Sequence, residues 1–594
     1  MAVESLITQH IDTWTSAVKT KSTSGRGSSK KLELYGVKKL RELILELAVR
    51  GKLVPQDPSD EPASVLLERI AVEKAQLVKE KKIKKPKNLP EISDEEKLFE
   101  LPLGWEWAKL GNVATLKGGF AYKSKEFVDS GIHQVIRMGN VRPDEFLLDQ
   151  KTAFIEQNYA DMTSEYQLSE DDVLLTMTGT KGKRDYLYSL VVSETHLNGR
   201  KLYLNQRLCS LSSVFCFSKF INVAVKSNTL LDTIFCKSTG TANQANIGMD
   251  AISNWIVPIA PLNEQHRIVA KVDELMALCD QLEQQTEASI EAHQLLVSTL
   301  LNTLTNSADA NELMENWARI SDHFDTLFTT EESIDQLKQT ILQLAVMGKL
   351  VPQDPNDEPA SILLERIAEE KALLIKEKKI KKQKALPPIA DDEKPFELPN
   401  GWEWERIGTF GVVGTGATPS RSNPKYWDSP DYNWVSSGET ADLFVGQTKE
   451  KVSALAIKET NVSVYPVGTL IVAMYGQGKT RGQITELSEP AGTNQACAAI
   501  SLIESNVAHK DFVKLYFRKS YEELRSNAAG GAQPNLNVGK IQSTVIAVPP
   551  LHEQQRINAK VHSLLELCES IKCKLAKAQA TQLHLTDAIV EQAV

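Results

Sequence analysis

Residues 44–71 read ILELAVRGKLVPQDPSDEPASVLLERIA, and residues 341–368 read ILQLAVMGKLVPQDPNDEPASILLERIA. Gly51 in the first stretch corresponds to Gly348 in the second, 297 residues later, which is half of the 594-residue chain. The agreement continues at the same offset through KEKKIKK (79–85 and 376–382), FELPLGWEW (99–107) and FELPNGWEW (396–404). An internal repeat of this length predicts two structurally similar halves.

A second pair of matching blocks closes each half. Residues 261–272 read PLNEQHRIVAKV, and residues 550–561 read PLHEQQRINAKV, at an offset that has fallen from 297 to 289. GTKGKR (179–184) matches GQGKTR (476–481) at offset 297, whereas Asn205-Gln206 matches Asn494-Gln495 at offset 289, so the eight missing residues lie between these two points. The two interiors of about 150 residues, a normal domain size, differ while their flanks agree. Duplication with even drift would spread the differences uniformly, so the pattern predicts one frame that carries two different domains.

The closing blocks have the spacing of long helices that pack against other helices. Apolar residues alternate at steps of four and three in both copies: Ile268, Val272, Leu275, Cys279 and Leu282, then Ile557, Val561, Leu564, Cys568 and Ile571. Such a heptad seam predicts helix pairing. We expect a helix from about Glu264 to Asn302 and its copy to pair antiparallel as a rod with one interior near each end. Two independent amphipathic helices are the alternative.

The flanks and interiors predict different structures. Leu40, Leu43 and Leu47 share one face of a helix that should end at Gly51, and second helices should start near Pro62 and its copy Pro359. Short apolar runs in the interiors predict strands at 172–177, 435–437, 469–474, 496–502 and 544–548. The Ser-, Gly- and Lys-rich segment 15–31 predicts a flexible arm.

The resulting fold class is mixed α/β. Two globular α/β domains are separated by a rod of long antiparallel helices, and an internal pseudo-two-fold repeat relates the halves. The predicted parts are an N-terminal helical flank (1–104), a first domain (105–260), a central helical spacer and repeat flank (261–401), a second domain (402–548) and a C-terminal helix that pairs with the central one (549–594).

Composition excludes several classes of protein. No apolar run is long enough for a membrane helix, and the N-terminus lacks a secretory pattern. The seven cysteines include no C-x-x-C pair, so we expect no disulfide framework or zinc knuckle and a cytoplasmic location. The net charge of −9 argues against nucleic acid only weakly, because DNA responds to local charge.

Three strings resemble catalytic motifs but lack essential parts. Asn423-Pro424-Lys425-Tyr426 resembles the N-P-P-Y of amino methyltransferases, yet Lys stands at the third position and no cofactor loop precedes it. Gly478-Lys479-Thr480 resembles a phosphate-binding loop, but the first glycine of that motif is replaced by Ala473. Asp144 and Asp149 stand too close together for the two strands of a nuclease metal site. We therefore expect no catalytic residue and no bound metal in this chain.

The pair Glu264 and Arg267, repeated as Glu553 and Arg556, has the i,i+3 spacing of an ion pair within one helix. We expect these residues to pair at the start of each long helix.

The remaining candidate residues are of types that bind DNA. The turns 179–184 (GTKGKR) and 476–481 (GQGKTR) combine glycine, which permits close backbone approach, with cations that neutralise phosphate or contact guanine. Amide side chains that recur in both halves can read adenine. Solvated loops and turn capping are the alternative for each single residue. The candidate DNA-binding residues are Arg137, Arg142, Lys181, Lys183, Arg184, Gln244, Asn246, Ser420, Arg421, Lys425, Tyr426, Gln477, Lys479, Thr480, Arg481, Gln533 and Asn535. The KEKKIKK runs either follow phosphates or are solvated helix ends.

On these repeated motifs, and on their order and spacing, the chain resembles the specificity subunit of type I restriction-modification systems over essentially its whole length. The resemblance implies that each interior is a target-recognition domain that reads one half of a split, asymmetric DNA site. It implies two methyltransferase subunits that carry S-adenosylmethionine, and restriction subunits that use ATP and magnesium. It also implies that this chain binds no cofactor and is not itself an enzyme.

Two other classes of function fit the sequence less well. A self-contained adenine methyltransferase would bind S-adenosylmethionine, but the methyltransferase motif is incomplete. A coiled-coil scaffold without a DNA role would not need two dissimilar globular interiors.

Overall fold

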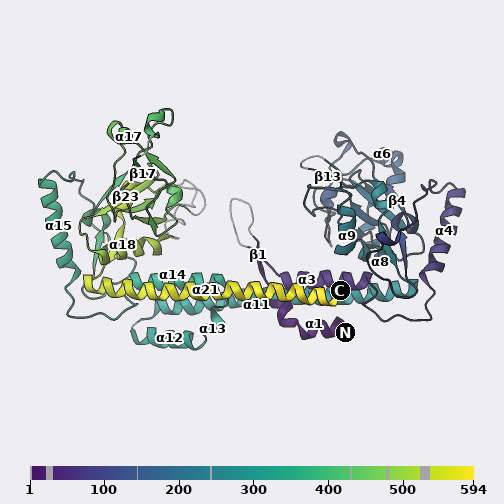
Figure 1. Cartoon of the computed structure of the whole chain (residues 1–594), viewed down its shortest axis with the longest axis horizontal. Helices are drawn as coiled ribbons and strands as arrows, with labels where there is room; N and C mark the ends of the chain where they lie inside the picture. The colour runs from purple at the N-terminus through teal and green to yellow at the C-terminus, as the bar shows by residue number, and fades with distance from the viewer. Residues whose placement is uncertain are drawn as a thin grey trace. The chain divides into compact units, whose positions relative to one another are not determined.

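The computed structural model describes residues 3–21, 31–143, 145–240, 244–308, 310–428, 431–475, 480–521 and 536–594. Its described residues form two compact units, and both long helices contribute to each of them. The first unit contains residues 3–21, 31–288 and 579–594, and the second contains residues 289–578. Figure 1 labels several elements of each unit. No helix among the described residues is long and apolar enough to cross a membrane.

The first unit is built on α3 (Tyr35–Val49), whose Leu40, Leu43 and Ile44 are fully buried. Gly51 follows the helix at φ 64°, a left-handed conformation that glycine adopts without a steric penalty, so the predicted end is confirmed. The other helices of the unit are α1 (Val3–Gln9), α2 (Ile11–Ser16), α4 (Ala63–Lys79), α5 (Leu110–Val113), α6 (Gln157–Met162), α7 (Glu194–Leu197), α8 (Ser218–Ala224), α9 (Asn228–Phe235) and α10 (Met249–Ser253).

The domain of the first unit begins with β3 (Glu106–Lys109), which pairs antiparallel with the last strand, β14 (Ile256–Ile259). This pairing closes the domain at its base. Its main sheet has the order β10 (Ser189–Val191), β8 (Val173–Thr176), β12 (Leu208–Ser213), β4 (Ala114–Gly118), and the predicted strand at 172–177 is β8. The smaller pairs are β5 (His133–Ile136) with β11 (Lys201–Leu204), β6 (Val141–Arg142) with β7 (Glu145–Phe146), and β9 (Thr178–Gly179) with β13 (Ala245–Asn246).

The domain of the second unit repeats this closure, since β15 (Glu403–Arg406) pairs antiparallel with β24 (Val545–Val548). Its main sheet has five strands in the order β16 (Gly411–Thr415), β23 (Cys497–Leu502), β20 (Leu470–Ala473), β21 (Ile484–Leu487), β18 (Phe444–Val445). A second sheet has the order β19 (Glu450–Val452), β17 (Tyr432–Val435), β22 (Ala491–Thr493). The helices are α12 (Ala310–Asp322), α13 (Phe324–Leu327), α14 (Glu331–Val346), α15 (Ala360–Lys376), α16 (Ile407–Phe410), α17 (Ala454–Glu459), α18 (Val507–Lys519) and α20 (Val538–Ser543).

The long helices are α11 (Leu262–Asn306) and α21 (Leu551–Ala593). In the second unit, Val297, Leu301 and Leu304 near the end of α11 share one hydrophobic cluster with Ile557 and Val561 near the start of α21. The end of one helix therefore lies in the same core as the start of the other, as antiparallel pairing requires. The prediction of paired helices is confirmed, whereas the distance between the two domains and the domain boundaries stay predictions.

A short helix fastens the long helices in each unit. In the first unit, Arg41 of α3 pairs with Asp280 of α11 at 2.6 Å, and Tyr35 donates a hydrogen bond to Asp587 of α21 at 2.7 Å. In the second unit, Lys572 of α21 pairs with Glu331 of α14 at 2.8 Å and with the Asp335 carboxylate at 3.1 Å. The repeated flank thus places a matching helix against the long helices in both halves.

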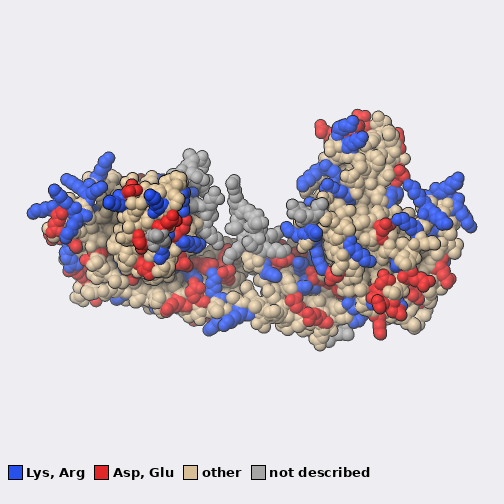
Figure 2. Space-filling model, turned by 45° about the horizontal axis from the view of Figure 1, so that its top comes forward, with Lys and Arg blue, Asp and Glu red and all other residues tan. Residues whose placement is uncertain are grey.

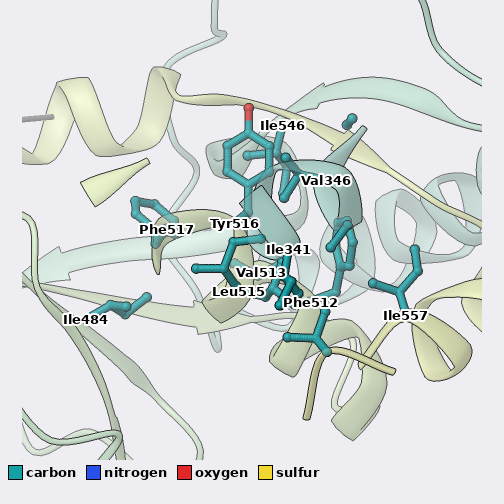
Figure 3. Close-up of a cluster of buried hydrophobic side chains, with 14 of the residues drawn as sticks. Ile341, Val346, Ile484, Phe512, Val513, Leu515, Tyr516, Phe517, Ile546 and Ile557 are labelled. Carbon is teal, nitrogen blue, oxygen red and sulfur yellow. The ribbon is translucent and has the colours of Figure 1, made fainter. Parts of the chain in front are cut away.

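The core of the second unit joins its domain to these helices. Figure 3 shows Phe512 and Val513 of α18 lying against Ile341 of α14 and Ile557 of α21. Phe512 is fully buried and meets the ring of Trp402 edge-on at 6.0 Å. Burying side chains of this size is the main source of stability for such packing.

Two predictions about local structure need correction. The run 435–437 is not a strand throughout, because β17 ends at Val435 and the Ser436 hydroxyl and backbone N–H both donate to the Glu439 carboxylate, which starts a 3-10 turn. The segment 15–31 is not an arm at its two ends, because β1 (Lys19–Lys21) pairs antiparallel with β2 (Lys31–Glu33). Residues 22–30 lie outside the described residues.

Candidate nucleic-acid interface

The repeated motifs meet at the base of each domain and form a clasp. In the first unit, Trp105 Nε1 donates to Glu264 at 3.0 Å, Gln56 donates to the same carboxylate at 3.2 Å, and Arg267 pairs with Asp60 at 2.6 Å. The expected Glu264–Arg267 ion pair within the helix is therefore wrong. The glutamate points to the tryptophan at the start of the domain, and the arginine points to the loop before α4.

The second unit repeats this clasp. Trp402 donates to Glu553 at 3.0 Å, Gln353 donates to it at 3.1 Å, and Arg556 pairs with Asp357 at 2.6 Å. Burial raises the pKa of both Glu264 and Glu553. The clasp fixes the start of each domain to the helix that follows its last strand.

A lysine that is buried in the first unit and half-buried in the second adds another fastening in each unit. Lys74 of α4 donates to the carbonyls of Gly111 at 2.6 Å and Ala114 at 3.0 Å, and so satisfies the end of α5. Lys371 of α15 donates to the carbonyls of Gly408 at 2.6 Å and Thr409 at 3.1 Å. Burial lowers the pKa of both lysines. The repeated residues therefore act on the frame, which leaves the divergent domain edges as the candidate interface.

In the first domain, the turn 179–184 projects three exposed cations, Lys181, Lys183 and Arg184. Asp185 fixes the turn, since it accepts hydrogen bonds from the Thr180 hydroxyl at 2.6 Å and from its backbone N–H at 2.7 Å. These hydrogen bonds lower the pKa of Asp185. The Arg184 guanidinium already interacts within the protein, because it pairs with Asp232 and lies 5.4 Å from the ring centre of Phe235.

Strand pairing brings the predicted amides to the same edge. Ala245 of β13 lies opposite Gly179 of β9, and Asn246 lies opposite Thr178. Gln244 and Asn246 are both exposed. The structure thus gathers the cations of the turn and two amide side chains along one short two-stranded edge, although they are about 60 residues apart in the chain.

The two remaining arginines of the first domain differ. Arg142 donates to the Val141 carbonyl at 3.1 Å. Burial raises the pKa of Tyr188, and the nearby positive charge of Arg142 opposes this rise. Tyr188 lies between the turn 179–184 and β10, so Arg142 belongs to the same neighbourhood. Arg137 instead donates to the Lys151 carbonyl and lies 5.8 Å from the ring centre of Phe127.

In the second domain, Arg421 is held by other side chains. Its two terminal nitrogens donate to Glu450 at 2.6 and 2.8 Å, and its guanidinium lies 3.8 Å from the ring centre of Trp427. Hydrogen bonding to Glu450 raises the pKa of Arg421. The fork that would contact a guanine is therefore already paired in this structure.

Several side chains near Arg421 are also hydrogen-bonded within the protein. The Tyr426 hydroxyl donates to Glu459 at 3.1 Å, and the Ser420 and Ser422 hydroxyls share a hydrogen bond of 2.8 Å. Lys425 is exposed and makes no ion pair with any described residue. Of the two loop cations Arg421 and Lys425, Lys425 is therefore the one that no described acidic side chain neutralises.

Of the other predicted residues of the second domain, only some lie within the described residues. Gln477, Lys479, Gln533 and Asn535 lie outside the described residues. Thr480 and Arg481 are half-buried, and Arg481 Nε is buried without a hydrogen-bond partner among the described residues.

Arg207 is a candidate that the sequence reasoning missed. It is exposed on the turn between β11 and β12, and its carbonyl accepts from the Met177 N–H at 2.9 Å, directly before β9. The signal was present, because the adjacent Asn205-Gln206 recurs as Asn494-Gln495. Within the described ranges, no group of three or more His, Cys, Asp or Glu residues could hold a metal ion.

Comparison with known proteins identifies relatives of this chain. The family of the type I restriction modification DNA specificity domain matches twice, over residues 102–292 and 399–579. The specificity subunits of the type I restriction enzymes EcoAI and EcoEI from Escherichia coli are each 41% identical over 610 residues, which covers 100% of this chain and of each relative. The crystal structure of the HsdS subunit from Thermoanaerobacter tengcongensis aligns with a TM-score of 0.38 and 17% identity, over 83% of this chain and 97% of that chain. The chain therefore belongs to the family of type I restriction-modification DNA specificity subunits.

Proposed function

We propose that this chain reads an asymmetric, bipartite DNA site, with one half recognised by each domain, and that it joins the catalytic subunits of a type I complex to that site. The observation that carries this proposal is the contrast between identical clasps and different domain edges. A duplicated frame that holds two dissimilar exposed edges suits a protein that must read two different sequences at a fixed spacing.

In the first domain, the edge formed by β9 and β13 is the proposed reading surface. Gln244 and Asn246 can bond adenine in the major groove, and Arg184 can bond guanine if it exchanges Asp232 for the base. Lys181 and Lys183 neutralise phosphates and set the position of the edge on the duplex.

In the second domain, Lys425 binds phosphate in this proposal, while Arg421 holds the loop in place through Glu450. Thr480 and Arg481, together with Gln477, Lys479, Gln533 and Asn535, complete the proposed contacts. Ser420 and Tyr426 contribute hydroxyls.

The catalytic work belongs to partners in this proposal. Two methyltransferase subunits dock on the helical frame, carry S-adenosylmethionine and methylate adenine that is extruded from the duplex toward them. Restriction subunits add translocation and cleavage driven by ATP and magnesium. This chain itself binds no cofactor and performs no catalytic step.

The test is single-molecule sequencing of DNA from a methylation-free host that makes this chain together with its methyltransferase subunit. The expected result is N6-methyladenine at one bipartite motif. Replacing Lys181, Lys183 and Arg184 with alanine should abolish or relax recognition of one half of that motif and leave the other half unchanged.

Exposed lysines of the first domain that lie outside this edge supply a matched control. Alanine at Lys123 and Lys125 should leave the motif unaltered. Methylation of the same motif without this chain would contradict the proposal, and so would the absence of adenine methylation when both proteins are made and associate.

A further inference from the structure

Helices α4 and α15 each end in a run of lysines. Residues 79–87 read KEKKIKKPK and residues 376–384 read KEKKIKKQK, so each run has six lysines, one glutamate and no arginine. We call these runs the first and second lysine segments. All of their lysines are exposed, in a chain whose net charge is −9.

Most of this charge is uncompensated. Lys82 pairs with Glu80 at 2.9 Å, Lys87 pairs with Asp250 at 3.0 Å, and Lys379 pairs with Glu377 at 2.9 Å. The other lysines of the two segments make no ion pair within the described part of the chain. Each segment therefore presents several free cations to solvent (Figure 2).

The helices themselves do not account for these lysines. A cation stabilises a helix dipole only within about the last turn, but Lys84 and Lys85 stand five and six residues beyond the end of α4. Lys81 and Lys378 both have φ 57°, a left-handed conformation in which glycine would avoid a steric cost. Lysine at this position in both halves indicates a role outside the helix end.

The residue type identifies the partner. Protein interfaces are depleted in lysine and enriched in arginine and aromatic residues, whereas base reading uses arginine and amides. Neutralising phosphates without reading sequence needs only a compact charge on a flexible stem, which is lysine. A segment with six lysines and no arginine therefore fits a nucleic-acid backbone better than a protein surface.

The first lysine segment also lies apart from the proposed reading edge of its domain. In the first unit, α4 stands at one side of the domain and β13, with Asn246, lies toward the other side (Figure 1). We propose that the two lysine segments bind the phosphate backbone of duplex DNA that flanks the bases read by each domain. This inference rests on the proposed function and adds a contact that extends the DNA site beyond its recognised sequence.

The experiment uses the full chain purified with its methyltransferase subunits. The probes are two duplexes that carry the motif found by methylation sequencing, one ending at the motif and one extending two helical turns beyond it on each side. The dissociation constant is measured over a salt series for the unaltered complex and for a glutamine variant of the first segment (Lys81→Gln, Lys84→Gln, Lys85→Gln), a glutamine variant of the second (Lys378→Gln, Lys381→Gln, Lys382→Gln), and arginine variants at the same positions.

On the long duplex, each glutamine variant should weaken binding by about tenfold and make the log–log salt slope shallower by about one for each lysine removed. On the short duplex, binding should change little. The arginine variants should keep the affinity and slope of the unaltered complex, because they keep the charge and show that the substituted segment still folds.

An unchanged slope on the long duplex, in a complex that still binds the motif, would overturn this inference alone. Weaker association with the methyltransferase at an unchanged slope would also overturn it and would assign the segments to a protein partner. Failure of the unaltered complex to bind the motif would instead remove the proposed function, and this inference with it.

Discussion

Glu46 of the first unit and Gln343 of the second occupy the same repeat position on α3 and α14, but they make different contacts. Glu46 is buried and accepts hydrogen bonds from the Ser227 hydroxyl at 2.7 Å and from Thr229, through its N–H at 3.0 Å and its hydroxyl at 2.7 Å. Among the described residues, the Gln343 side chain donates only to the sulfur of Met347, at 3.2 Å. The frame helix therefore fastens α9 through a carboxylate in the first unit, and within the described residues Gln343 makes no matching contact in the second.

The clasps show the opposite behaviour. The Trp–Glu hydrogen bond is 3.0 Å in both units, and the Arg–Asp ion pair is 2.6 Å in both. The units match at the clasps and at the Lys74 and Lys371 contacts, and they differ at the contact of the frame helix with α9. This contrast teaches that the repeat maintains the attachment of the domains, while the contact between the frame helix and the divergent interior is free to change.

The largest expected effect tests whether the two cores are equivalent. Phe220 and Phe512 are both fully buried and meet Trp105 and Trp402 at 6.0 Å. Alanine at either position should destabilise its own unit by about 3–5 kcal/mol, because a large cavity forms beneath the clasp. Hydrogen exchange resolved by peptide should show faster exchange in the altered unit. Leu103→Ala is the control, since that side chain is 98% exposed and should change stability by less than about 0.5 kcal/mol. Equal exchange in both units for either variant would contradict the division of the core.

The second-largest expected effect comes from exchanging the residue types at Glu46 and Gln343, which distinguish the two units. Glu46→Gln should cost about 1–3 kcal/mol, because the donors of Ser227 and Thr229 lose a charged acceptor in a buried site. Faster hydrogen exchange in α9 would report it. The reciprocal Gln343→Glu is the matched control and should not slow exchange in α18. An unchanged α9 in the Glu46→Gln variant would mean that its N-terminal Ser227 cap holds the helix unaided.

Much of the frame could be predicted from the sequence because its signals are local or repeated. The end of α3 at Gly51 and the start of α4 after Pro62 follow from residues that stand beside the boundary in the chain. The buried strand β8 follows from a short apolar run. Pairing of the long helices follows from their shared heptad spacing.

The clasp and the site could not be predicted in the same way. Spacing within a helix finds only neighbours on that helix, so Glu264 was matched with Arg267 and not with Trp105, 159 residues away. Arg421 has the sequence setting of a base contact, but Glu450, 29 residues later on β19, holds both of its terminal nitrogens. The sequence predicts the residues of the edge that β13 and β9 form, but it does not predict that these two strands pair.

A smaller effect concerns pH and tests whether the two clasps are energetically alike. Burial raises the pKa of Glu264 and Glu553 above the ordinary value of 4.5, so the folded chain holds these protons to higher pH than the unfolded chain does. Their contribution to stability is therefore fully present below pH 4.5 and is lost as pH rises through the raised pKa. Glu264→Gln and Glu553→Gln should each remove part of this loss, and the double variant should remove both parts. Melting temperatures measured from pH 4 to pH 8 would check this, and a pH profile identical to that of the unaltered chain would contradict the burial argument.

The smallest expected effect separates two cations of one loop. Lys425→Gln should weaken DNA binding to a similar extent on all sequences and reduce the log–log salt slope by about one, because an unpaired cation on the loop is removed. Arg421→Gln should instead change stability by at most about 1 kcal/mol, since the Arg421–Glu450 pair is exposed, and should leave the slope nearly unaltered. Titrations of the same duplex over a salt series compare the two variants directly. A larger slope change for Arg421→Gln than for Lys425→Gln would mean that Glu450 releases the guanidinium to the DNA, and the second domain would then read its half-site with the residue that this structure shows paired.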